Sequence, residues 1–113
     1  MTYYNPGKFF KPAIDSILNQ TYNNFEFILL NDGSNDGSDH VASQYNDNRV
    51  RNIACPTRMG RTGALNYALR AAKGEFIAIL DADDICDEYR LELQINFLEQ
   101  NTGVVLVGSE CHY

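Results

Sequence analysis

The segment Glu75-Phe-Ile-Ala-Ile-Leu-Asp-Ala-Asp-Asp84 decides how this chain is expected to fold. Its apolar residues favour extended backbone, and a short apolar run of this kind is typical of a buried strand. Three carboxylates follow within four residues, at the point where the predicted strand ends. We therefore expect a buried strand over residues 76–80 that delivers its acidic side chains to the edge of a sheet.

The spacing of these carboxylates favours a metal site. Asp81 and Asp83 are two residues apart, so an extended backbone points both side chains to the same side. Carboxylates that lie close together repel each other unless a cation neutralises them. A hard divalent cation takes oxygen ligands and leaves coordination positions for phosphate oxygens. The alternative is that Asp81, Asp83 and Asp84 cap the N-terminus of the next helix.

A second predicted strand, Phe25–Leu30, makes the same transition, here into Asn31-Asp-Gly-Ser34. Ligands of parallel sheets bind beyond the carboxyl ends of the strands, so Asp32 is expected on the same edge as the acidic segment. The alternative for Asp32 is an Asx-turn. A calcium loop is disfavoured, because Ser43 stands where such a loop needs a bidentate glutamate.

The rest of the chain alternates between helical and extended patterns. The first predicted helix has Pro12 in its first turn, carries an apolar stripe from Phe10 to Leu18 and ends near Gln20. Further helices are predicted after a cap at Ser38 or Asp39 through Tyr45, over 62–72 and from 87 or 88 onward, and strands over 25–30, 50–54, 76–80 and 103–108. This alternation predicts an α/β fold with a parallel sheet and right-handed crossovers. Gly74 is expected to end the third helix. Only Met1–Asn5 precede the first helix, so the first strand is expected to be a stub or to lack its beginning.

Composition narrows the function classes. A length of 113 residues predicts one domain, and 44% hydrophobic with 21% charged residues is ordinary for a globular protein. A net charge of −6 without a basic run argues against nucleic-acid binding. No signal peptide or membrane span is predicted. A cytoplasmic location is expected, because the three cysteines lack the spacing of a zinc site or a disulfide framework: Cys55, Cys86 and Cys111.

Taken together, these segments resemble the N-terminal part of a family 2 glycosyltransferase, which has the parallel-sheet, Rossmann-like GT-A fold. The resemblance covers almost the whole chain, because several pieces occur in order and at family-like spacing. These pieces are Thr2–Asn5, Ser16–Tyr22, Asn24–Ser34, Gly60–Asn66, Lys73–Phe76 and Leu80–Asp84.

The resemblance implies an activity and a metal. Members of this family transfer a sugar from a nucleotide diphosphate donor, usually a UDP-sugar, to an acceptor hydroxyl, with inversion and with Mn²⁺ or Mg²⁺. The family's DXD motif matches Asp81-Ala-Asp83. By that match, Asp83 would ligate the metal and Asp81 would contact the ribose or the donor sugar.

The resemblance also implies a pocket for the nucleobase. Thr2 and Tyr4 would line this pocket, with Tyr4 stacking on the base. Asp32 would accept a hydrogen bond from the base. Arg58 or Arg61 would reach the base or the phosphates, and the sequence does not separate the two.

The chain departs from the family pattern at two places. Asn31 stands where an acidic residue is commoner, and the sequence stops at Tyr113, before the family's acceptor half and its catalytic base. We therefore expect a domain that is incomplete at both ends. It would hold the donor and metal site but lack the base, and a saccharide or lipid-linked acceptor would be recognised elsewhere.

Other functions are also compatible with the pattern. A phospho-acceptor signalling domain is α/β and binds Mg²⁺, but it needs a lysine after its fifth strand, and Lys8, Lys11 and Lys73 lie elsewhere. A non-catalytic nucleotide-binding or interaction module would self-associate through an exposed apolar surface. Peripheral association with the inner face of the membrane is also left open.

Overall fold

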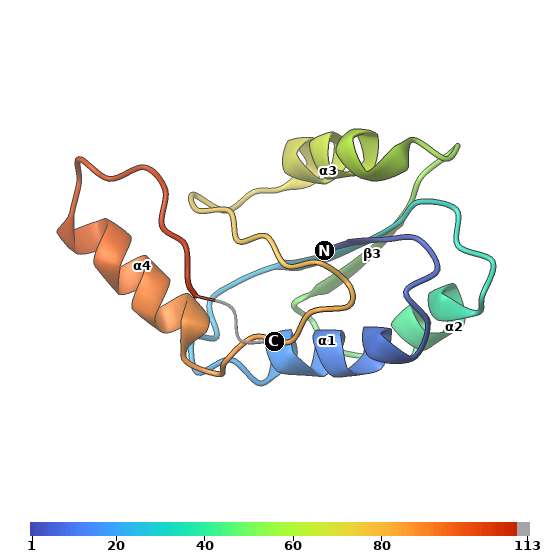
Figure 1. The fold of residues 1–113 in the computed structure, drawn as a ribbon, viewed down its shortest axis with the longest axis horizontal. Helices are drawn as coiled ribbons and strands as arrows, with labels where there is room; N and C mark the ends of the chain where they lie inside the picture. The colour runs from blue at the N-terminus through green and yellow to red at the C-terminus, as the bar shows by residue number, and fades with distance from the viewer. Residues whose placement is uncertain (111–113) are drawn as a thin grey trace.

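The computed structural model describes residues 1–110, so Cys111 lies outside the described residues. The described part has three layers, with helices on both faces of a small sheet (Figure 1). The elements in chain order are β1 (Thr2–Tyr3), the 3₁₀ helix η1 (Gly7–Phe9), α1 (Phe10–Leu18), β2 (Phe27–Asn31), α2 (Ser38–Ser43), β3 (Val50–Ala54), α3 (Gly60–Ala71) and α4 (Arg90–Gln100).

The sheet is parallel and has the order β1-β2-β3, which confirms the predicted parallel α/β architecture. β2 lies in the middle, with Thr2 opposite Leu30 on one side and Asn31 opposite Ala54 on the other. β1 is a stub of two residues. All three strands therefore end at the same edge of the sheet.

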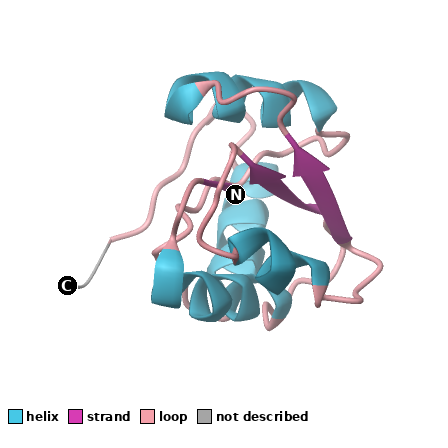
Figure 2. Cartoon of the chain, turned by 90° about the vertical axis from the view of Figure 1, so that its right-hand side faces the viewer, coloured by secondary structure: helices cyan, strands magenta, loops and turns pink. Residues whose placement is uncertain are grey.

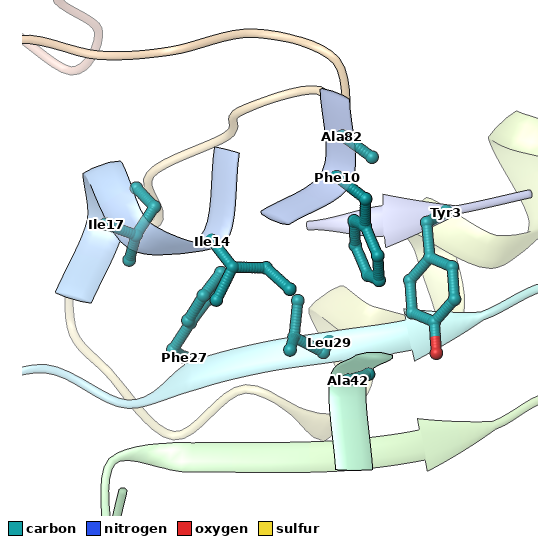
Figure 3. Packing of buried hydrophobic residues seen from close by; sticks show 8 residues of the cluster. All are labelled: Tyr3, Phe10, Ile14, Ile17, Phe27, Leu29, Ala42 and Ala82. Carbon is teal, nitrogen blue, oxygen red and sulfur yellow. The ribbon is translucent and has the colours of Figure 1, made fainter. Parts of the chain in front are cut away.

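The central strand is buried on both faces, as its apolar sequence predicts. Phe27 and Leu29 face α1 and α2, whereas Ile28 and Leu30 face α3. Figure 2 shows the sheet enclosed between these helices. The larger cluster, drawn in Figure 3, comprises Tyr3, Phe10, Ile14, Ile17, Phe27, Leu29, Ala42 and Ala82. On the other face, Ala64 and Ala68 let α3 approach the strand closely.

Helix boundaries shift by a few residues from the prediction. α1 begins at Phe10, so Pro12 lies in its first turn as predicted, and it ends at Leu18, two residues before the predicted end near Gln20. α3 ends at Ala71, and Ala72 is already extended, so the prediction that Gly74 ends this helix is wrong. α4 begins at Arg90 rather than at residue 87 or 88.

The strands predicted over 76–80 and 103–108 are wrong, because the structure assigns both segments to irregular backbone. Ile79 is about half exposed, and Val105 is 95% exposed. The outer edge of the sheet is β1, and two residues offer too few backbone groups to hold a five-residue neighbour by hydrogen bonds. The segment 103–108 then has no strand beside it to pair with.

Among residues 1–110, no helix combines the length and apolarity that crossing a membrane would require.

The burial of β2 predicts which side chains cannot be shortened without loss of stability. Leu29 is 0% exposed, so Leu29→Ala should lower the free energy of unfolding by about 2–5 kcal/mol through lost burial and a residual cavity. Leu93 on α4 is 65% exposed, so Leu93→Ala should stay within about 0.5 kcal/mol of the wild type. Urea unfolding followed by circular dichroism measures both, and equal losses would contradict this core.

Candidate functional site

The loops that follow the three strands meet at the carboxyl edge of the sheet. Asp32 N–H donates to the Tyr3 carbonyl at 2.9 Å, and Cys55 N–H donates to the Asn31 carbonyl at 2.9 Å, so the backbones remain in register one residue past each strand. A cavity of about 510 Å³ lies there. Its walls include all the site residues proposed from the sequence: Thr2, Tyr4, Asp32, Arg58, Arg61, Asp81 and Asp83.

A larger hollow of about 1040 Å³ lies between α3, α4 and the irregular segment before Asp81. It shares only Thr2, Arg61 and Asp81 with the smaller cavity, and apolar side chains supply most of its remaining wall. A binding site is marked by a few convergent polar groups rather than by volume alone. The cavity at the carboxyl edge is therefore the candidate site.

Asp32 is the buried carboxylate of this cavity, with 3% exposure. Its Oδ1 accepts from Met59 N–H at 2.7 Å, and its Oδ2 accepts from Gly60 N–H at 2.8 Å. Both donors lie at the N-terminus of α3, where backbone N–H groups lack partners in the helix and favour negative charge. Asp32 therefore joins the end of β2 to the start of α3.

The Asx-turn expected as the alternative for Asp32 is made by its neighbour. Asn31 Oδ1 accepts from Ser34 N–H at 2.7 Å, which closes the turn after β2. The alternative is thus wrong for Asp32, because the side chain of Asp32 bonds across to another loop.

Two titratable groups beside the cavity stay protonated at neutral pH. Burial, together with the neighbouring Asp32 carboxylate, raises the pKa of the Cys55 thiol. Burial, with smaller contributions from Asp39 and Asp36, raises the pKa of Tyr3 to about 12. Tyr3 packs on Phe10 with ring centroids 4.4 Å apart. Both groups are therefore parts of the scaffold rather than nucleophiles.

A polar lock that was not predicted from the sequence fixes the loop carrying Tyr4. Asn5 Nδ2 donates to Asn35 Oδ1 at 3.0 Å, and Asn35 N–H donates back to Asn5 Oδ1 at 2.8 Å. Gly7 N–H donates to Asp36 Oδ2 at 3.1 Å. Asn5 adopts a positive φ of 49°, which a short polar side chain tolerates. The only signal in the sequence was the dense polar turn at 31–39.

The structure separates the two arginines that the sequence left equivalent. The Arg58 guanidinium carbon lies 3.8 Å from the centroid of the Tyr4 ring, a cation–π contact. Arg61 donates from Nη2 to both carboxylate oxygens of Asp81, each at 3.0 Å. Arg58 thus belongs to the aromatic side of the cavity and Arg61 to the acidic side.

The acidic residues do not cap the following helix, so that alternative is wrong. α4 begins at Arg90, and the residue at its N-cap, Tyr89, makes no side-chain cap bond. Asp87 Oδ1 accepts from Tyr89 N–H at 2.9 Å instead. Asp81 and Asp83 line the cavity, where Asp81 is paired with Arg61 and the exposed carboxylate of Asp83 makes no hydrogen bond within residues 1–110.

These two carboxylates fit a divalent cation that brings further ligands with it. Within residues 1–110, no group of three or more His, Cys, Asp or Glu side chains is arranged to hold a metal ion. Asp81 is already paired with a cationic group, Arg61, and Asp83 is exposed and makes no hydrogen bond within the described residues. A cation bound here would complete its shell with phosphate oxygens and water, as Mg²⁺ and Mn²⁺ do.

Comparison with known proteins gives a consistent result. The family model described as glycosyl transferase family 2 matches residues 1–112. The glycosyltransferase GlyG of Streptococcus pneumoniae is 37% identical over 112 residues, which is 97% of this chain and 37% of GlyG. The chain spans less than half the length of the curated relatives that it matches first.

Solved structures show the same fold. TarS of Staphylococcus aureus, residues 1–349 in complex with UDP-GlcNAc, is 26% identical with a TM-score of 0.82, over 89% of this chain and 30% of that one. The mannosyltransferase PcManGT of Pyrobaculum calidifontis, in complex with GDP-Man and Mn²⁺, is 28% identical with a TM-score of 0.75, over 86% of this chain and 30% of that one.

The two bonds to Asp32 predict a cost for losing its charge. In Asp32→Asn, one amide N–H group would face a backbone donor, so one hydrogen bond and the favourable charge at α3 would be lost. The free energy of unfolding should fall by about 1–3 kcal/mol. Glu99→Gln, an exposed change on α4, should leave it within about 0.5 kcal/mol. Unchanged urea unfolding in Asp32→Asn would refute this anchoring role.

Proposed function

Because the chain belongs to glycosyl transferase family 2, we propose that it binds a nucleotide diphosphate sugar in the cavity at the carboxyl edge of its sheet. In the enzyme that contains it, the sugar passes to an acceptor hydroxyl. The observation that carries this proposal is the convergence of an aromatic ring, a buried carboxylate, two arginines and two further carboxylates on one cavity of about 510 Å³.

On the aromatic side, Tyr4 stacks on the nucleobase and Thr2 lines the pocket. Tyr4 is 42% exposed, and the lock between Asn5 and Asn35 holds its loop at the cavity. Asp32 uses its remaining lone pairs to accept a hydrogen bond from a base N–H, since each of its oxygens has one donor in the described structure. A uridine nucleotide is supported by the UDP-GlcNAc complex of TarS.

On the acidic side, Asp83 ligates Mn²⁺ or Mg²⁺ and Asp81 contacts the ribose or the donor sugar. The Mn²⁺ complex of PcManGT supports a divalent cation in this fold. Such a cation, when bound, offsets the charge that develops on the departing diphosphate. Arg61 neutralises Asp81 before the donor arrives and then offers its guanidinium to the phosphate oxygens.

The reaction inverts the configuration at the anomeric carbon of the donor sugar. The acceptor oxygen attacks that carbon from the side opposite the diphosphate, the bond to the diphosphate breaks, and a carboxylate base takes the hydroxyl proton. The residues described here serve this step by holding the donor in one orientation, which lowers the entropic part of the barrier.

Donor binding should depend on the metal through Asp83. Calorimetric titration of the wild-type chain with UDP should show binding that weakens on replacing Mn²⁺ by a chelator. Asp83→Asn should weaken the Mn²⁺-dependent binding by about tenfold or more, the effect of losing one charged interaction of about 1.4 kcal/mol.

The matched control is Asp84→Asn, which removes the same charge from the neighbouring residue. Asp84 is exposed and does not line the cavity, so its replacement should change UDP affinity by less than about threefold. Binding that is indifferent to Mn²⁺, or equal losses in both variants, would overturn the assignment of Asp83.

The pair between Arg61 and Asp81 predicts opposite effects on the metal and on the nucleotide. Arg61→Gln removes a positive charge that repels a cation from the acidic side of the cavity, so Mn²⁺ affinity without nucleotide should rise by up to about fivefold. UDP affinity should fall, because the phosphates lose a donor. Electron paramagnetic resonance of free Mn²⁺ measures the metal affinity, and calorimetry measures the UDP affinity.

The control for this change is Arg70→Gln, on the same helix as Arg61. Arg70 is exposed and lies outside the cavity, so both affinities should match those of the wild type. A fall of both affinities in Arg61→Gln would show that Arg61 does not repel the cation.

A further inference from the structure

One buried side chain fastens the end of α1 to the segment that follows the carboxylates. Gln20 is 3% exposed. Its Nε2 donates to the carbonyl oxygen of Ser16 at 3.1 Å and to that of Asp87 at 2.6 Å. Its Oε1 accepts from Leu91 N–H at 2.9 Å. A single amide just past the end of α1 therefore bonds back to that helix and forward to residues 67 and 71 positions later.

The bond to Leu91 supplies a cap that α4 lacks. Leu91 lies in the first turn of α4, where backbone N–H groups have no partner within the helix. The N-cap residue, Tyr89, contributes no side-chain cap bond. Gln20 caps this helix from outside and so decides where α4 begins relative to α1.

The contacts of Gln20 require an amide rather than a carboxylate. Nε2 faces two carbonyl oxygens and Oε1 faces an N–H group, so the group must donate on one side and accept on the other. A glutamate of the same shape would place a charged oxygen against the carbonyls of Ser16 and Asp87. Gln20→Glu should therefore disrupt these hydrogen bonds without changing the size of the side chain.

Two neighbours extend the fastening. Ser16 Oγ accepts from Cys86 N–H at 3.3 Å, and Thr21 N–H donates to the Glu88 carbonyl at 2.9 Å. Thr21 Oγ1 donates to Glu92 Oε2 at 2.8 Å. We call Ser16, Gln20 and Thr21 the α1 clasp.

The α1 clasp fixes one end of the segment 81–86, which we call the acidic loop. Ala82 is buried in the cluster around Phe10, as Figure 3 shows, and Cys86 is bonded to Ser16. Only residues 83–85, all exposed, lie between these two fixed points. The direction of the Asp83 carboxylate is therefore set by where the two ends are held.

The segment upstream of the acidic loop provides little independent support. Residues 73–79 are exposed and form no strand. The carbonyl of Ile79 accepts from Arg90 Nη2 at 3.0 Å, and Arg90 belongs to α4, which the α1 clasp holds. The carboxylate of Asp81 is held by Arg61 of α3, whereas the backbone on either side of Asp83 is held by contacts with α1 rather than by pairing in the sheet.

We propose that Gln20 is a positioning residue of the metal site, which acts through Asp87 and Leu91 to aim Asp83 into the cavity. This inference rests on the proposed function, because it takes Asp83 as the metal ligand. Gln20 touches neither metal nor nucleotide. Its loss should weaken the metal part of donor binding and leave the base pocket at Tyr4 and Asp32 intact.

The test measures metal binding and metal-free nucleotide binding separately in the variants Gln20→Met and Gln20→Glu. Mn²⁺ affinity in the presence of UDP, measured by electron paramagnetic resonance, should fall about 10- to 100-fold, as when a residue that orients a metal ligand is lost. UDP affinity in the presence of a chelator, measured by ligand-observed nuclear magnetic resonance, should change less than about threefold.

The matched controls are Gln44→Met and Gln44→Glu. Gln44 also stands at the end of a helix, α2, but it is exposed and far in sequence from the acidic loop. Both control variants should bind Mn²⁺ and UDP as the wild type does. Folded Gln20 variants with wild-type Mn²⁺ affinity would overturn the proposal, and so would a parallel loss of metal-free UDP binding.

Two further measurements keep the test decisive. Thr21→Val replaces the Gln20 variants if these do not fold. It is an exposed change that removes one hydroxyl of the α1 clasp, and it should also weaken Mn²⁺ binding. Hydrogen exchange at the Leu91 amide should accelerate in Gln20→Met without any ligand. A wild-type chain that binds neither UDP nor Mn²⁺ would refute the proposed function, whereas unchanged exchange at Leu91 would refute the α1 clasp itself.

Discussion

Burial of β2 on both faces is the constraint on which the structure depends. Four successive apolar residues, 27–30, alternate between a layer of α1 and α2 and a layer formed by α3. Because β2 pairs in parallel with both of its neighbours, the chain leaves all three strands at one edge. Asp32, the first side chain past the pairing, then bonds to the N-terminus of α3 and lines the cavity.

The electrostatics of the cavity suit a doubly charged cation and a diphosphate together. Asp32, Asp81 and Asp83 face Arg58 and Arg61, so three negative charges stand against two positive ones. A divalent cation would make the balance positive, which favours an anionic donor. Without it, the pairing of Arg61 with Asp81 limits repulsion among the carboxylates.

The position of the acidic loop follows from both its local sequence and its tertiary contacts. Its carboxylates were predicted to sit at the tip of a strand, and they do line the predicted edge, although that strand is absent from the described fold. The burial of Ala82 and the α1 clasp supply the anchors instead. Ser16, Gln20 and Thr21, which belong to a predicted helix and to a family-like stretch, are joined by these hydrogen bonds to the segment after the carboxylates.

Local patterns in the sequence sufficed to predict the parallel α/β sheet and the acidic residues beyond its strands, because apolar periodicity and polar strand ends are local signals. Thr2, Tyr4, Arg58 and Arg61 were expected at the site only through the resemblance to a family. Tertiary structure alone decided the partners of these residues. Only the folded chain brings Asp32 to the amides of Met59 and Gly60, and Arg58 to Tyr4. It also decided against the strands at 76–80 and 103–108, since pairing requires a neighbouring edge that no local pattern can guarantee.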